Sequence, residues 1–237
     1  MENGTPGYAL SNMPPAATDF IMGVERPSQL DAWAGKAEPF KDDPVTYNAI
    51  QAGREALTNG AAKIRALSSD LTRSEPQRHE AGGVVSAKTA GALEETQRIL
   101  NARANAYQAA GDEALREAFP VKAEDKWVYD RWLSFLEREV VNQDGGLGNI
   151  RKATMANETL ATVITKMPAE LMPLKGEFLA KLKEDVIAKY HPNIGEAFER
   201  AGEMRELAGK YMSLAARVKL NFHSPLHASK MKTRVEV

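Results

Sequence analysis

NIGEAFERAGEMRELAGKYMSLAARVKLNF, residues 193–222, is the stretch that decides the fold class. Its apolar residues recur at steps of three and four, the period of one face of an α-helix. The residues on this face are Ile194, Ala197, Phe198, Ala201, Met204, Ala208, Tyr211, Met212, Ala215, Val218 and Phe222. Such a helix is ~45 Å long, longer than a compact domain of this size needs. We therefore expect it to pack against another long helix or a neighbouring subunit.

Two further helices have clear start signals. Asp43 is a good N-cap and Pro44 suits a first helical position, so we expect a helix over 44–68. Ser74 and Gln77 have the spacing of a capping box, which predicts the start of a second helix.

Pro120 is expected to end that second helix, because proline cannot continue one. Apolar residues at helical spacing then predict helices within 124–141, 149–167 and 171–190, with Pro173 in the first turn of the last. The chain is therefore predicted to be all-α, an elongated multi-helix bundle.

The first 43 residues differ in composition from the rest. Five prolines restrict the backbone there, so we expect an extended, proline-rich N-terminal arm. The arm also carries large apolar residues, which favours an arm that lies on its own domain or on a neighbour; a loose tail is the alternative. The candidate partner-interface residues of the arm and the last helix are Tyr8, Leu10, Phe20, Ile21, Trp33, Phe198, Tyr211 and Met212.

The segment QDGGLGNIRK, residues 143–152, has the outward look of a nucleotide loop. A phosphate-binding loop needs a preceding strand and a defined glycine spacing, and this segment has neither. We expect Gly145 or Gly146 to supply a left-handed residue after one helix, and Asn149 to cap the next. The predicted domains are an arm (1–43), a helical lobe (44–144), a glycine hinge (145–149), C-terminal helices (150–222) and a basic tail (223–237).

The C-terminal tail is the one locally basic feature. Lys230, Lys232 and Arg234 are candidates for phosphate contacts, which would give weak, non-specific DNA binding. A solvated tail that binds nothing is the alternative. The last five residues, TRVEV, alternate as a short edge strand would.

Composition excludes several classes of protein. The chain has 237 residues, 43% of them hydrophobic and 27% charged, with a net charge of −1. These are ordinary globular values, and the charge gives no general attraction to nucleic acid or anionic lipid. The absence of cysteine excludes disulfides, thiolate metal sites and thiol nucleophiles. With no signal peptide and no apolar run long enough to span a bilayer, we expect cytoplasmic synthesis and no membrane span.

Motifs that carry catalysis are missing from the sequence, so we predict no catalytic residue, no cofactor site and no metal site. His223 and His227 have an i, i+4 spacing, but Pro225 between them argues against a helix, and no nearby carboxylate completes a ligand set. We expect these two residues, His79 and His191 to be surface or capping residues.

The layout resembles that of the helical accessory proteins of tailed-phage virions. The likeness rests on the apolar-studded arm GYALSNMPPAATDFIMG (7–23), on alanine-rich helices such as LEETQRILNARANAYQAAGDEAL (93–115), and on the absence of cysteine. It implies a non-enzymatic, homo-oligomeric structural subunit of a head, neck or internal core, incorporated into a virion. Two alternatives stay open: a cellular adaptor or chaperone that binds a partner helix, and a hydrolase, such as a phage cell-wall hydrolase, with an unrecognised acid.

Overall fold

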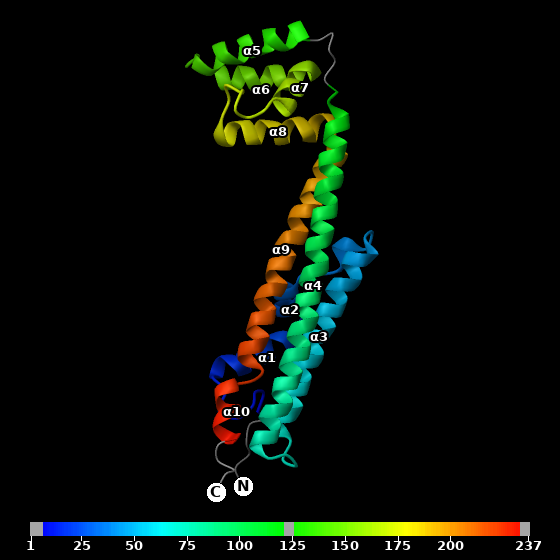
Figure 1. Cartoon of the computed structure of the whole chain (residues 1–237), viewed down its shortest axis with the longest axis vertical. Coiled ribbons are helices and arrows are strands. Elements are labelled where there is room, and N and C mark those ends of the chain that lie inside the picture. Colours follow the sequence, from blue (N-terminus) through cyan, green and yellow to red (C-terminus); the bar gives the residue numbers. More distant parts are fainter. Residues whose placement is uncertain (1–6, 121–125, 233–237) are drawn as a thin grey trace. The chain divides into compact units, whose positions relative to one another are not determined.

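The computed structural model describes residues 7–120 and 126–232, and this part of the chain is helical and contains no strand (Figure 1). The all-α prediction is therefore confirmed for it, while the strand-like segment 233–237 lies outside the described residues. The chain forms two compact units. Unit 1 combines Met1–Ala104 with Glu203–Val237, and unit 2 is Asn105–Gly202. The predicted lobe 44–144 thus contains parts of both units.

Three long helices build unit 1. These are α3 (Pro44–Ser69), the larger part of α4 (Glu75–Ala118) and the C-terminal part of α9 (Pro192–Asn221), which lie side by side in Figure 1. Asp43 caps α3 as predicted, accepting a hydrogen bond from the backbone N–H of Thr46. The Ser74 N–H donates to the Gln77 side chain (2.9 Å) at the predicted start of α4.

Glycines on α3 allow these helices to approach closely. A Cβ atom added at Gly53 would lie 2.5 Å from the ring of Tyr211, and one at Gly60 would lie 2.9 Å from the ring of Phe222. Both aromatic rings belong to the α9 region and are completely buried. Close backbone approach therefore replaces side-chain interdigitation at these positions.

The extended conformation predicted for the N-terminal arm is wrong over its described residues. The arm folds into α1 (Pro15–Glu25), α2 (Pro27–Ala34) and the short 3₁₀ helix η1 (Glu38–Phe40). The reason is that Pro15 and Pro27 each occupy a first helical position, where the fixed φ of proline favours a helix and its missing N–H costs nothing. α1 and α2 pack on α3.

Unit 2 contains α5 (Lys126–Val141), α6 (Gly146–Ala156), α7 (Glu158–Lys166) and α8 (Gly176–Tyr190), with the adjoining parts of α4 and α9. α6 and α7 each contact both α5 and α8, so they form the middle layer of this group. Its main buried cluster consists of Leu136, Ile150, Leu160, Val163, Ile164, Met172, Leu174, Leu179 and Leu182.

Two helix boundaries of unit 2 differ from prediction. The continuous helix expected over 149–167 is broken at Asn157, whose side chain accepts a hydrogen bond from the Leu160 N–H and begins α7. Pro173 precedes α8 and is not in its first turn, because the helix begins at Gly176, which has a positive φ of 68°.

The glycine segment forms the turn between α5 and α6, and both helices belong to unit 2. Gly145 is left-handed (φ 91°), as predicted, and begins α6. A Cβ atom at Gly146 would overlap the backbone carbonyl oxygen of Glu139. Asn149 is not the predicted N-cap: it lies within α6, and its amide donates to the Glu139 carboxylate (3.0 Å).

Candidate functional site

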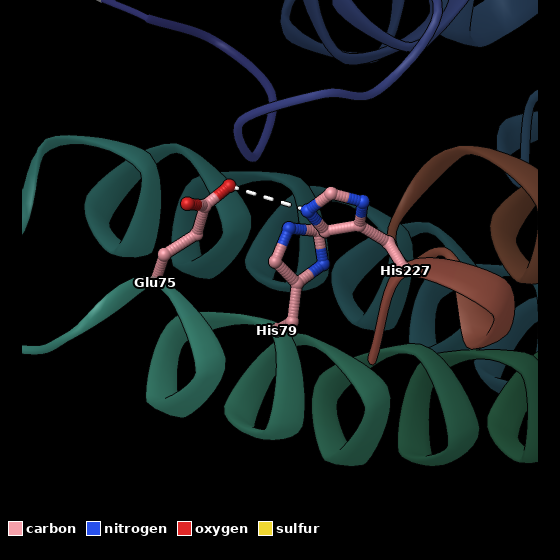
Figure 2. A group of neighbouring side chains, drawn as sticks. All are labelled: Glu75, His79 and His227. Atoms are coloured by element: carbon pink, nitrogen blue, oxygen red, sulfur yellow. Dashed lines mark hydrogen bonds and ion pairs between the residues drawn. The ribbon is translucent and has the colours of Figure 1, made fainter. Parts of the chain in front are cut away.

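Glu75, His79 and His227 form a cluster of potential metal ligands in unit 1 (Figure 2). Glu75 and His79 lie in the first two turns of α4, and their i, i+4 spacing places them on one face of that helix. His227 comes from α10 (Pro225–Lys232), which packs its imidazole against that of His79 with ring centroids 4.7 Å apart. One ligand atom from each residue lies within 4.8 Å of the other two.

The loop before α1 completes the surroundings of this cluster. The Asn12 amide donates to Oε1 of Glu75 (2.7 Å) and lies 3.2 Å from Nε2 of His227. Glu75 Oε1 and His227 Nε2 are themselves 3.3 Å apart. The Ser11 carbonyl oxygen is 3.0 Å from Nε2 of His79. Asn12 reaches this position with a left-handed backbone (φ 59°), a conformation that asparagine tolerates better than most residues.

Burial sets the electrostatics of the cluster. His79 is completely buried, and this burial lowers the pKa of its imidazole despite the hydrogen bond to the Ser11 carbonyl. A hydrogen bond from the Ser11 side chain lowers the pKa of the Glu75 carboxyl, with further contributions from His227 and Asn12. The site therefore favours a neutral His79 beside an ionised Glu75, which are the protonation states of metal ligands.

Sequence reasoning missed this cluster for two reasons. Pro225 argues against a helix in the sequence, but in the structure it occupies the first position of α10, and Ser224 caps that helix through its hydroxyl and carbonyl groups. The carboxylate that accompanies His227 is that of Glu75, which is 152 positions away in the sequence. His79 is buried and is not the predicted surface or capping residue. The available signal was the i, i+4 pair of Glu75 and His79.

The predicted partner-interface residues have different positions in the structure. Leu10, Phe20, Ile21 and Tyr211 are buried within unit 1 and do not reach its surface. Tyr8 and Trp33 are half-buried, each with an arginine over its ring, while Phe198 is half-buried against Gly111 in unit 2. Met212 is exposed.

Met212 belongs to a stripe on α9 that is exposed except at the half-buried Gly209. Gly209, Met212, Ala216 and Leu220 follow one another at steps of three and four, which places them on one helix face. Met212 and Leu220 are 57% and 72% exposed, and no atom lies within 4 Å of the Cβ position of Gly209. We call these four residues the α9 stripe.

Other predicted features are left partly untested. Lys230 and Lys232 lie in α10, but their side chains, and the whole of Arg234, are outside the described part of the chain, so phosphate binding stays a prediction. No helix among the described residues is both long and apolar enough to cross a bilayer. The hydrolase alternative predicts an acid with a raised pKa. Where a shift is resolved among the described carboxyl groups, it is downward in every case, as for Asp31, Asp43 and Glu139.

Searches with this chain found no matching family model, no similar curated protein and no similar solved structure. The proposals below therefore rest on the chemistry and geometry of the chain itself.

Proposed function

We propose that this chain is a non-enzymatic structural subunit of a larger protein assembly, and that copies of the chain associate through the α9 stripe. The single observation that carries the proposal is the stripe itself. Four small or apolar residues follow the heptad-like spacing of a helix–helix contact, yet Met212 and Leu220 are left uncovered by the described part of the chain. Gly209 and Ala216 leave room for the backbone of a partner helix to approach.

A second copy of the chain is the occupant that we propose for the α9 stripe. The charged residues beside the stripe already have partners within the chain, because Glu206 pairs with Lys210 (2.9 Å) and Lys219 pairs with Glu94 (2.6 Å). Exposed ion pairs of this kind contribute little to affinity, so the apolar residues of the stripe carry the contact. A two-fold symmetric contact is the commonest kind between identical subunits.

The sequence layout extends this proposal to a component of a tailed-phage head, neck or internal core. Such particles are built from repeated subunits, and a helix that pairs with its own copy supplies one of the contacts that repetition needs. The composition of the native particle or complex that contains the chain tests this part. Co-purification with tailed-phage structural proteins supports it, and a strict monomer that co-purifies with nothing overturns it.

Self-association through the stripe is tested by light scattering and sedimentation at micromolar concentration. Replacing Met212 and Leu220 by lysine is expected to convert the dimer into a monomer. The matched control carries lysines at Leu71 and Val84, which are 92% and 53% exposed in unit 1 but lie off α9, and it is expected to stay dimeric.

A wild-type monomer, or a dimer indifferent to Met212 and Leu220, would show that the stripe is not the contact.

A further inference from the structure

The three ligand atoms of the Glu75, His79 and His227 cluster are close to the spacing of a coordination sphere. In a tetrahedral site with bonds of about 2.0–2.2 Å, neighbouring ligand atoms lie roughly 3.3–3.6 Å apart. Glu75 Oε1 and His227 Nε2 are 3.3 Å apart, and the imidazole of His79 lies within 4.8 Å of both. Glu75 and His227 are about one-third and one-quarter exposed, so both side chains have room to rotate and close the set.

We propose that Glu75, His79 and His227 bind a divalent transition-metal ion, with Zn²⁺ as the best match. Two imidazoles and one carboxylate are a common zinc ligand set. Mg²⁺ and Ca²⁺ prefer sites made entirely of oxygen atoms, so the two nitrogen ligands disfavour them. The proposal concerns ion binding and is independent of how copies of the chain associate.

Neighbouring groups prepare the site for a cation. The Asn12 amide donates to Glu75 Oε1 and lies 3.2 Å from His227 Nε2, and a metal ion bound to these two atoms would take its place. The Ser11 carbonyl oxygen, 3.0 Å from Nε2 of His79, or a water molecule would supply the fourth ligand.

The proton on His79 affects the strength of binding. Its Nδ1 is buried without a hydrogen-bond partner, whereas its Nε2 faces the Ser11 carbonyl. Figure 2 shows Nε2 on the side of the ring that faces Glu75 and His227, so Nε2 is the nitrogen placed to bind the ion. Binding through Nε2 leaves the proton on Nδ1, which has no acceptor among the described residues, so the affinity is expected to be about 10–100-fold below that of a site whose outer hydrogen bonds are complete.

A bound ion would connect parts of unit 1 that are far apart in sequence. Glu75 and His227 are separated by 152 positions, and the ion would fasten α10 to the start of α4. We therefore expect metal to protect α10 from proteolysis.

The proposal is tested by titrating the full chain, without a histidine tag, with Zn²⁺ in a calorimeter, and with Co²⁺ by visible absorption. One ion per chain and the absorption of tetrahedral Co²⁺ are expected. Glu75→Gln and His227→Ala are each expected to lower the affinity by at least about tenfold. Circular dichroism checks that both variants stay folded.

His223→Ala is the matched control. His223 lies against Gly83, one turn beyond His79, and is outside the proposed ligand set, so this variant is expected to bind Zn²⁺ as the parent does. The proposal is overturned if the parent binds no Zn²⁺ at millimolar concentration, if Glu75→Gln and His227→Ala bind it undiminished, or if Mg²⁺ and Ca²⁺ bind as tightly as Zn²⁺.

Discussion

Replacing Gly53 by alanine is expected to destabilise unit 1 by about 1–3 kcal/mol. Gly53 lies on α3, where an added Cβ atom would be 2.5 Å from Cε1 of Tyr211 and 2.8 Å from Oγ1 of Thr96. Favourable carbon contacts lie at about 3.5–4.0 Å, so the neighbours must move by roughly 1 Å. This displacement is large for a close-packed interior.

The size of the effect follows from how firmly those neighbours are held. Tyr211 is completely buried, and its hydroxyl donates to the Ile50 carbonyl (3.1 Å). Overpacking costs about 1–3 kcal/mol, and weakening that hydrogen bond costs about 1 kcal/mol more. Alanine recovers about 1 kcal/mol through its higher helix propensity. The net loss is therefore expected to be about 1–3 kcal/mol.

Gly91→Ala is the matched control, because Gly91 lies within α4 and no atom lies within 4 Å of its Cβ position. It is expected to stabilise unit 1 by about 0.5–1 kcal/mol. Both variants are made in a background in which Trp127 and Trp132 are replaced by phenylalanine, so that the fluorescence of Trp33 reports on unit 1 alone. Their free energies of unfolding are then measured in urea. If Gly53→Ala is as stable as Gly91→Ala, the close packing of α3 on Tyr211 is refuted.

Two further predictions concern stability. Burial by itself raises the pKa of Asp43, but hydrogen bonds from Thr46 and Arg103 outweigh it and hold the pKa below its usual value. The stability that this carboxylate provides is therefore present above about pH 4 and is lost as pH falls through the lowered pKa. Asp43→Ala is expected to lower the free energy of unfolding by about 2 kcal/mol at pH 7. Its melting temperature is also expected to fall less than that of the parent as the pH is lowered. Gly146→Ala is expected to destabilise unit 2 by about 3 kcal/mol in thermal unfolding, because the added Cβ atom meets a backbone carbonyl that cannot rotate away. The control is Gly148→Ala, where no described atom lies within 4 Å of the added Cβ atom, and this variant is expected to be neutral or stabilising.

The sequence predicts those elements whose signals are local. Asp43 with Pro44, the pair Ser74 and Gln77, and Pro120 give correct helix ends, because capping and proline sterics involve neighbouring residues only. The period of residues 193–222 likewise gives α9 almost to the residue.

Prediction fails where distant residues decide the outcome. Proline in a sequence generally indicates a loop. Pro15 and Pro27 instead begin helices, because α1 and α2 are short and are stabilised by packing on α3. The Glu75 and His227 pair depends on a contact across 152 positions, which no local spacing reveals. Gly146 is a further case, because the need for glycine there comes from the backbone carbonyl of Glu139, which leaves no space for a Cβ atom.

The last helix shows how a sequence pattern can contain two contacts at once. Its apolar face includes the adjacent residues Tyr211 and Met212, which point about 100° apart around a helix. In the structure Tyr211 is buried against α3, while Met212 is 57% exposed. Contacts within unit 1 thus account for the Tyr211 side of the face and leave Met212 and Leu220 uncovered. The apolar face is therefore wider than the fold of unit 1 requires, and the uncovered part of it is the surface that we propose for a second helix.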